Sequence, residues 1–333
     1  MVNISASPHI RSGLSTTTVM QDVVIALLPA LAMGVFVFGL RALVIIFLCA
    51  VTAVVTEYLY RRLMKLPQTI SDCSALVTGL ILAANMPASV SWWIPVLGTV
   101  FAVVVVKQLF GGLGQNIMNP AMTARCFLLI SFPALMGAGM PAVGNLFGPD
   151  ALQGFLQRMS TFTVDAISGA TPLQVLKEGD SIDLLQAFLG LHSGCIGETS
   201  TLAILLGAVY MLWRGVISPR IPGVYLASTL AFVALFCAVT DRTLSANFML
   251  GQLCTGGLMF GAVFMATDYV TSPITPWGQV IYGVLLGLLT ALFRVFGGTA
   301  EGVSYAIIIG NLLVPLIEKV TVPRPFGKRG GAK

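Results

Sequence analysis

One hydroxyl stands out in the longest polar stretch of the chain, within the segment Asp165-Ala-Ile-Ser-Gly-Ala-Thr-Pro-Leu173. Three small residues make a slim and flexible turn in this segment: Ser168, Gly169 and Ala170. Thr171 presents its hydroxyl on this turn, and Pro172 keeps the next residue from continuing a helix or strand undisturbed. Such a turn suits entry into the active site of another enzyme, because a hydroxyl is a poor nucleophile until a base or a metal activates it. An ordinary turn is the alternative interpretation.

Two asparagines stand close together in a glycine-rich connection, Gly111-Gly-Leu-Gly-Gln-Asn116-Ile-Met-Asn119-Pro120. Asn116 and Asn119 are three residues apart, so they share a face if this turn is helical. An asparagine amide both donates and accepts hydrogen bonds, as the edge of a flavin or a quinone requires. The glycines allow a close backbone approach, and Pro120 can begin the next helix. A capped, broken helix is the alternative, and no strand precedes the glycines as a dinucleotide-binding fingerprint would need.

Arg125 is the only basic residue that we place well inside an expected membrane helix. Ionisable residues inside a membrane are candidates for function. The Arg125 side chain could hold the anionic edge of a cofactor, or it could reach back to the cytoplasmic face, and the sequence favours neither. Asp72 and Asp268 flank corresponding regions of the two halves of the chain, and we interpret them as solvated helix ends rather than as parts of an ion path.

The sequence offers no catalytic centre of its own. His9 and His192 lie on opposite predicted sides of the membrane, so they cannot share a metal ion. None of the six cysteines forms a Cys-x-x-Cys pair, and structural zinc and iron–sulfur clusters need closely spaced thiolates. No Ser-His-Asp or Cys-His set is evident. We therefore predict neither catalytic residues nor metal ligands in this chain.

The composition requires a lipid environment. The chain has 333 residues, of which 56% are hydrophobic and 9% are charged, and its mean hydropathy is +0.92. An ordinary soluble domain is about 25% charged, so this much apolar surface cannot be buried in one soluble core. The net charge is +5, but the basic residues sit at the ends of apolar runs, as membrane topology requires. A nucleic-acid-binding protein would instead cluster them on one solvated domain, and we expect no such partner.

Ten apolar segments are candidates for membrane helices. In the first half they span roughly 22–40, 42–60, 74–87, 92–110 and 121–140, and in the second roughly 200–217, 223–240, 248–267, 277–296 and 303–320. A crossing takes about 20 residues, so the short third and fifth segments are expected to be broken or tilted. The long polar stretch between the halves, residues 141–199, is called the outer loop below. Helix-like patches at Ala151–Met159 and Ser181–Leu191 indicate that it is folded.

The distribution of basic residues orients the chain. With the N-terminus inside and ten crossings, twelve of the Lys and Arg residues fall inside and five outside, with Arg125 left within a segment. The positive-inside rule then places both termini in the cytoplasm and the outer loop in the periplasm of a bacterial inner membrane. The predicted regions are a cytoplasmic N-terminal segment (1–21), a first membrane half (22–140), the outer loop (141–199), a second membrane half (200–320) and a basic cytoplasmic tail (321–333).

The two halves carry a weak internal repeat. Two pairs of stretches are similar: Ser74-Ala-Leu-Val-Thr-Gly79 with Gly256-Gly-Leu-Met-Phe-Gly261, and Lys107-Gln-Leu-Phe-Gly-Gly112 with Arg294-Val-Phe-Gly-Gly298. Five crossings in each half would give the repeats opposite orientations, an arrangement that brings broken helices together near the midplane. Chance similarity between glycine-rich helices is the alternative. We also expect Gly257 and Gly261 to lie on one helix and form a Gly-x-x-x-Gly face, for close packing or for a flat cofactor.

Asp165-x-x-Ser168-Gly169-Ala170-Thr171 resembles the Asp-x-x-Ser/Thr-Gly-Ala-Thr flavinylation signature. In that signature a flavin transferase outside the cytoplasm moves FMN from FAD onto the last threonine as a phosphoester. Nearly the whole chain is similar to the family of Rnf D subunits and of B subunits of the sodium-translocating NADH:quinone reductase, in segment number, outer-loop position and basic tail. The chain begins almost directly at the first helix, whereas the quinone-reductase protein carries a longer extension, and this favours the Rnf type.

The resemblance implies an all-α subunit of a redox-driven pump, which couples electron transfer between ferredoxin and NAD to movement of Na⁺ or H⁺. It implies covalent FMN on Thr171, and it extends to a noncovalent riboflavin near Asn116 and Asn119, with Arg125 as a further candidate. Nucleotide and iron–sulfur chemistry would belong to partner subunits of the A, B, C, E and G types, so this chain would not be catalytic alone. A urea- or ammonium-type channel, which should be colourless, and a structural anchor with an unmodified Thr171 are the alternatives.

Overall fold

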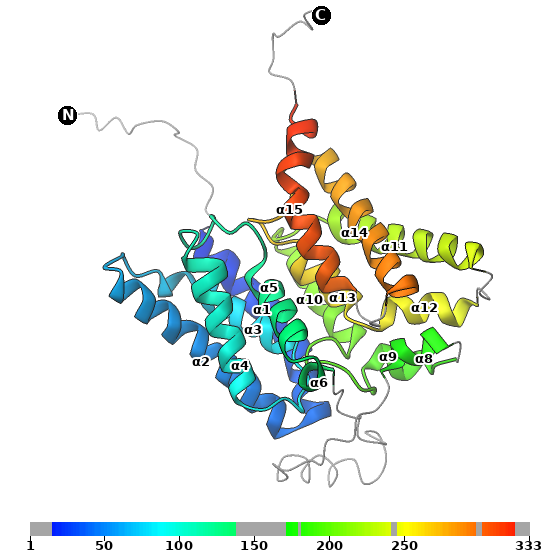
Figure 1. The fold of residues 1–333 in the computed structure, drawn as a ribbon, viewed down its shortest axis with the longest axis horizontal. Helices are drawn as coiled ribbons and strands as arrows, with labels where there is room; N and C mark the ends of the chain where they lie inside the picture. The colour runs from blue at the N-terminus through cyan, green and yellow to red at the C-terminus, as the bar shows by residue number, and fades with distance from the viewer. Residues whose placement is uncertain (1–14, 138–170, 179–180, 241–244, 298–301, 324–333) are drawn as a thin grey trace, which may run out of the picture.

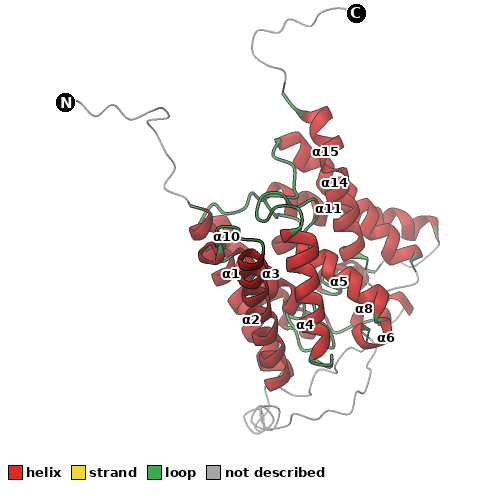
Figure 2. Ribbon diagram, turned by 60° about the vertical axis from the view of Figure 1, so that its left-hand side comes forward, coloured by secondary structure: helices red, strands yellow, loops and turns green. Residues whose placement is uncertain are grey.

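A computed structural model describes residues 15–137, 171–178, 181–240, 245–297 and 302–323. Helices and their connections make up this part of the chain (Figure 2), and its one bridge between extended residues pairs Pro87 with Cys195. The all-α membrane class predicted from the sequence is confirmed for these residues.

The helices follow one another closely. The first half contains α1 (Thr16–Phe38), α2 (Leu40–Leu63), the 3-10 helix η1 (Ile70–Asp72), α3 (Ser74–Ala84), α4 (Trp93–Val100), the π-helix η2 (Phe101–Gln108), α5 (Pro120–Ser131) and α6 (Pro133–Met136). Two short helices come next, α8 (Pro172–Glu178) and α9 (Leu184–Leu189). The second half contains α10 (Thr201–Trp213), α11 (Arg220–Val239), α12 (Ala246–Cys254), α13 (Leu258–Phe260), the π-helix η3 (Gly261–Met265), α14 (Pro276–Phe296) and α15 (Val303–Thr321).

All ten apolar segments of the sequence form helices, but their lengths differ. Within the described residues five helices are long and apolar enough to cross a membrane, namely α1, α2, α11, α14 and α15. A sixth is added if the bent pair formed by α12 and by α13 with η3 counts as one span. The remaining apolar helices are shorter: α3, α4 with η2, α5, and α10. The third and fifth segments form the short helices α3 and α5, whereas their predicted break or tilt and the ten crossings remain predictions.

The second half contains a helix that is broken at two glycines. The chain bends by 55° between α12 and the helix formed by α13 and η3. Gly256 and Gly257 lie in this break with φ angles of +69° and +66°, in the left-handed region that favours glycine. The expected Gly-x-x-x-Gly helix face is therefore wrong, because Gly257 precedes the helix and only Gly261 lies within it.

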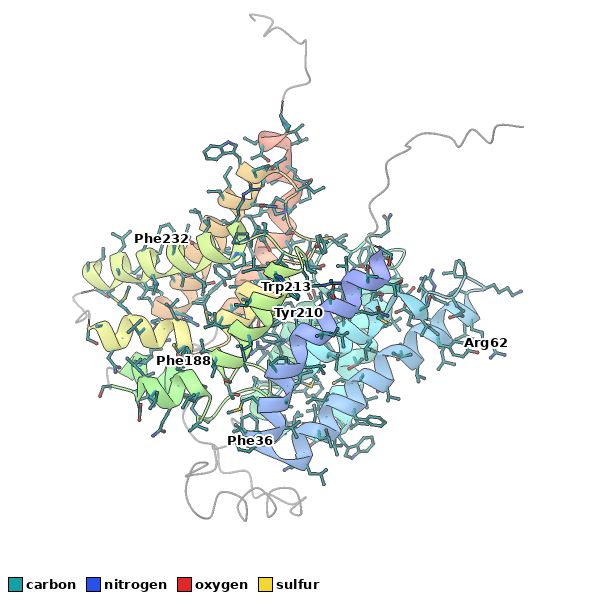
Figure 3. The ribbon with its side chains drawn as sticks, turned by 180° about the vertical axis from the view of Figure 1, so that it is seen from behind. Phe36, Arg62, Phe188, Tyr210, Trp213 and Phe232 are labelled. Atoms are coloured by element: carbon teal, nitrogen blue, oxygen red, sulfur yellow. The ribbon has the colours of Figure 1, made fainter. Side chains whose placement is uncertain are left out.

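α1 joins the two halves. It packs against α2 and α3 of the first half and against α10 of the second. Gly207 on α10 lies so close to the Ala26 carbonyl that a side chain there would collide with it. Asp22 accepts a hydrogen bond from the hydroxyl of Tyr210 (Figure 3) at 2.9 Å and pairs with Arg214 Nε at 3.2 Å. One hydrophobic cluster consequently runs through both halves.

The ends of the helical body lie on one side. Figure 1 shows the start of α1 and the end of α15 toward the same side, whereas α6, α8 and α9 lie toward the opposite side. The described chain therefore enters and leaves the helical body on the side away from the helices that border the outer loop.

Candidate functional site

Thr171 lies immediately before α8. Its main-chain carbonyl accepts hydrogen bonds from Gln174 N at 2.8 Å and from Val175 N at 3.1 Å, so its backbone belongs to the first turn of the helix. Pro172 occupies the first helical position, where a missing N–H costs nothing. The sequence analysis predicted a turn here but missed the helix, although proline is a common signal for a helix start. The rest of the motif lies outside the described residues: Asp165, Ser168, Gly169 and Ala170.

The two helices of the outer loop that the structure describes, α8 and α9, rest on the second half of the molecule. Of the two helix-like patches, Ser181–Leu191 forms α9, which Asp183 caps by accepting from the main-chain N–H groups of Leu185 and Gln186. The other patch, Ala151–Met159, lies outside the described residues. Both α8 and α9 pack against α12, as their neighbouring positions in Figure 1 show. Thr171 is thus attached to an ordered part of the fold, with its side chain half-buried.

Asn116 and Asn119 line one cavity between the two halves. Asn119 caps α5, because its Oδ1 accepts from Ala121 N at 3.1 Å and from Met122 N at 3.3 Å. Its Nδ2 also donates to the main-chain carbonyl of Met265 at 3.5 Å, across the boundary between the halves. The interpretation as a helix cap therefore holds for Asn119.

Asn116 has a spare acceptor. Its Oδ1 is buried, yet it has no hydrogen-bond partner within the described residues. The cavity wall beside it combines apolar side chains, such as Phe264, with the polar side chains of Lys107 and Asp268. An unused buried acceptor in a largely apolar cavity fits the polar edge of a flavin ring, whose N–H group can donate to it.

Arg125 belongs to a different site. Its NH1 donates to Asn85 Oδ1 at 2.5 Å and to the Glu198 carboxylate, and its NH2 lies 3.6 Å from Cys195 Sγ. The side chain is 3% exposed and does not line the asparagine cavity, so it neither reaches the surface of the molecule nor joins Asn116. The sequence could not place it, because its partners are 40 to 73 residues away.

Two further cations, which the sequence places at the ends of apolar runs, are buried. Lys107, on η2, forms an ion pair with Glu57 at 2.8 Å and donates to Ser74 Oγ at 2.6 Å. Arg294, on α14, donates to the carbonyls of Gln252, Thr255 and Gly256 beside the break in the second half. Arg125 is therefore not the only base inside the helical body. Lys107 and Arg294 both lie at the ends of apolar runs, so hydropathy alone could not reveal that their side chains are buried.

These features define a class of protein: a polytopic helical membrane protein whose interior is built around broken helices and buried ion pairs. The model of the NQR2, RnfD, RnfE family matches residues 3–327. The chain therefore belongs to this family, as the resemblance predicted.

Three relatives are named as D subunits of redox complexes. The D subunit of the Na⁺-translocating ferredoxin:NAD⁺ oxidoreductase complex of Acetobacterium woodii is 44% identical, over 98% of this chain and 95% of its own length. The D subunit of the ion-translocating oxidoreductase complex of Actinobacillus succinogenes is 38% identical, over 98% of each chain. The D subunit of the proton-translocating ferredoxin:NAD⁺ oxidoreductase complex of Clostridium ljungdahlii is 37% identical, over 98% of this chain and 96% of its own length.

Proposed function

We propose that this chain is a flavin-carrying membrane subunit of an ion-translocating electron-transport complex of the ferredoxin:NAD oxidoreductase type. The near-full-length match to D subunits of such complexes supports this function. The names of the relatives include both Na⁺ and proton translocation, so either ion is compatible with the proposal. The chain would act with A, B, C, E and G subunits, which would supply the nucleotide and iron–sulfur chemistry.

The proposal depends on one observation: a member of this family contains the sequence Asp165-x-x-Ser-Gly-Ala-Thr171, which resembles the flavinylation signature. Thr171 would receive FMN as a phosphoester from a flavin transferase. When bound, the isoalloxazine ring supplies the electron chemistry, and the protein positions it. Because the Thr171 carbonyl closes the first turn of α8, the residue offers its hydroxyl from the end of an ordered helix.

The test is the mass of the peptide that contains Thr171, from the protein produced with and without the transferase. We expect the added mass of a phosphoester-linked FMN only when the transferase is present. The purified protein should be yellow, and its absorbance should bleach on reduction. An unmodified peptide from a colourless protein would support the channel alternative or the structural anchor and would overturn the proposal.

The proposed topology has both termini in the cytoplasm and residues 141–199 in the periplasm of a bacterial inner membrane. The excess of basic residues on the predicted inner side supports it. The separation of the ends of the helical body from α8 and α9 in Figure 1 agrees with this orientation. A flavin transferase of the periplasm could then reach Thr171.

An inverted repeat is proposed for the two halves. The sequence similarity pairs Ser74 with Gly256 and Lys107 with Arg294. In the structure Lys107 donates to Ser74, and Arg294 donates to the Gly256 carbonyl, so the two matched pairs make matching contacts. Each contact holds the chain at or just before a short helix that follows a left-handed residue. These shared contacts support the repeat over chance similarity between glycine-rich helices.

A noncovalent riboflavin is proposed for the cavity of Asn116 and Asn119. The buried and unused Oδ1 of Asn116 supports it. In this proposal Asn116 accepts a hydrogen bond from the flavin edge, whereas Asn119 keeps the start of α5 in place. Arg125, also named as a candidate from the sequence, is not part of this proposal, because it pairs with Glu198 away from the cavity wall.

Asn116→Ala is expected to remove most of the flavin that denaturation releases, because the acceptor is lost while no hydrogen bond within the described residues is broken. Flavin bound covalently at Thr171 should stay at its normal amount. The measurement compares released with protein-bound flavin in the purified complex. Ile117→Ala is the control, because Ile117 belongs to the same connection but its side chain is 48% exposed and does not line the cavity. Equal release from the parent and from the Asn116→Ala variant would contradict the assignment.

A further inference from the structure

The helix that carries Thr171 is seated in the molecule by two leucines. Leu173 and Leu176, on α8, are 3% and 2% exposed. Leu176 faces Gly251 on α12: a Cβ added to this glycine would lie 2.7 Å from Leu176 Cδ1. Leu173 faces Gly256 in the break after α12 so closely that a Cβ there would collide with its Cδ2. The two glycines, called the glycine notch below, receive the two leucines.

Polar contacts hold the same segment on both sides of the notch. The Lys177 ammonium donates to the main-chain carbonyl of Gly297, just after α14. Ile182 and Asn247 form two hydrogen bonds: Ile182 N donates to Asn247 Oδ1 at 3.2 Å, and Asn247 Nδ2 donates to the Ile182 carbonyl at 2.8 Å. The segment from α8 to α9 is thus attached at several points to α12 and to the end of α14.

Thr171 is attached through its backbone to the helix that the glycine notch receives. It lies two residues before Leu173, and its carbonyl is hydrogen-bonded into the first turn of α8. The backbone of Thr171, to which any attached group is tethered, therefore cannot move far unless Leu173 leaves Gly256. The same break also contacts Glu198, because a Cβ on Gly257 would lie 2.6 Å from a Glu198 carboxylate oxygen.

We propose that the glycine notch is a positioning site, in which Gly251 and Gly256 hold α8 so that the attachment point of a flavin on Thr171 occupies one fixed place beside the break in the second half. This inference takes its cofactor from the proposed function. The packing of α8, which holds residue 171 in place, does not depend on that function. A fixed attachment point limits the flavin to the reach of its own linker, so the notch sets the region in which a redox partner must meet it.

The first measurement needs no flavin. Cys73 and Cys254 are the half-buried native cysteines, and both are replaced by serine. A nitroxide is attached through Thr171→Cys, and its electron paramagnetic resonance spectrum is recorded in the purified full chain. We expect a spectrum dominated by slow motion. A spectrum as mobile as that of a label at exposed Val239 would overturn the inference.

Gly251→Val then fills the notch. It should push out Leu176 and raise the fast-moving fraction of the nitroxide several-fold. Gly223→Val is the matched control, because Gly223 is also a helical glycine but faces open space. Leu176→Ala is a second, milder variant, which empties the notch if Gly251→Val fails to fold. Nitroxide spectra that match those of the Gly223→Val control in both notch variants would contradict the inference.

The second measurement uses the protein with native Thr171 and the transferase present. The fluorescence anisotropy of the covalent flavin should decay slowly in the parent and faster in Leu176→Ala, with the flavin content unchanged. If the nitroxide spectrum shows slow motion but the native protein carries no covalent flavin, the proposed function is refuted and the positioning role of the notch stands. Equal anisotropy decays of the parent and of Leu176→Ala would refute the positioning role of the notch and leave the proposed function intact.

Discussion

Thr171→Ala is expected to reduce the covalent flavin of this chain to background. Alanine lacks the hydroxyl oxygen that would form the phosphoester, so no rearrangement of the turn can replace it. The fold should tolerate the change, because Thr171 contributes its main-chain carbonyl to α8 and Pro172 still begins the helix. The measurement is flavin fluorescence of the chain after denaturing electrophoresis, with the transferase present. Electron transfer through the assembled complex should fall with it.

The controls for this variant separate the hydroxyl from its surroundings. Thr171→Ser keeps an oxygen at the same position and should retain part of the flavin. Thr163→Ala removes a hydroxyl from the same loop but lies outside the motif, so it should leave the fluorescence unchanged. Asp165→Asn tests the upstream carboxylate without touching the acceptor. A fluorescent band that survives in Thr171→Ala would move the anchor to another residue.

Much of the fold could be predicted from hydropathy. Apolar segments long enough to cross lipid are visible in the sequence because each residue contributes locally, and all ten formed helices. The break at Gly256 and Gly257 was missed because it depends on distant side chains. Arg294 holds the Gly256 carbonyl, Glu198 lies against Gly257, and Leu173 fills the space beside Gly256. None of these contacts leaves a periodic pattern in the sequence.

The residues of the candidate site also differ in how well the sequence could place them. Asn116 and Asn119 could be paired from their spacing, because both belong to one short connection, and the structure places both at one cavity. Arg125 could not be placed, because the residues that accept its hydrogen bonds come from the end of α3 and from the end of the outer loop. Lys107 and Arg294 resembled ordinary charged helix ends. Their burial follows from the short helices they hold, which hydropathy does not reveal.

The buried pair between Arg125 and Glu198 is expected to matter most for stability. The two side chains are 3% and 4% exposed. Asn85, which also accepts from Arg125, caps the C-terminal end of α3, and Glu198 faces Gly257 at the N-terminal end of α13. A cation near a helix C-terminus and an anion near a helix N-terminus both have the favourable sign. The pair therefore links short helices of both halves to the end of the outer loop.

Glu198→Ala should lower the free energy of unfolding by about 3–5 kcal/mol, because it removes the carboxylate that faces a buried guanidinium. The charge of Arg125 would stay in a poorly solvated place, so the cost exceeds the loss of one hydrogen bond. Replacing both residues by methionine should recover most of the stability, because an apolar pair of similar size has no charge to desolvate. Thermal unfolding of the purified protein, followed by the fraction that stays monodisperse, measures the difference.

Arg214→Ala is the matched control for Glu198→Ala, because Arg214 also belongs to an ion pair but its side chain is 45% exposed. Water can replace much of that interaction, so the expected cost is below about 1 kcal/mol. A Glu198→Ala protein as stable as the Arg214→Ala protein would show that water reaches Arg125, and the buried pair would then not hold the outer loop. If the double methionine variant were no more stable than Glu198→Ala, the loss would come from packing rather than from the uncompensated charge.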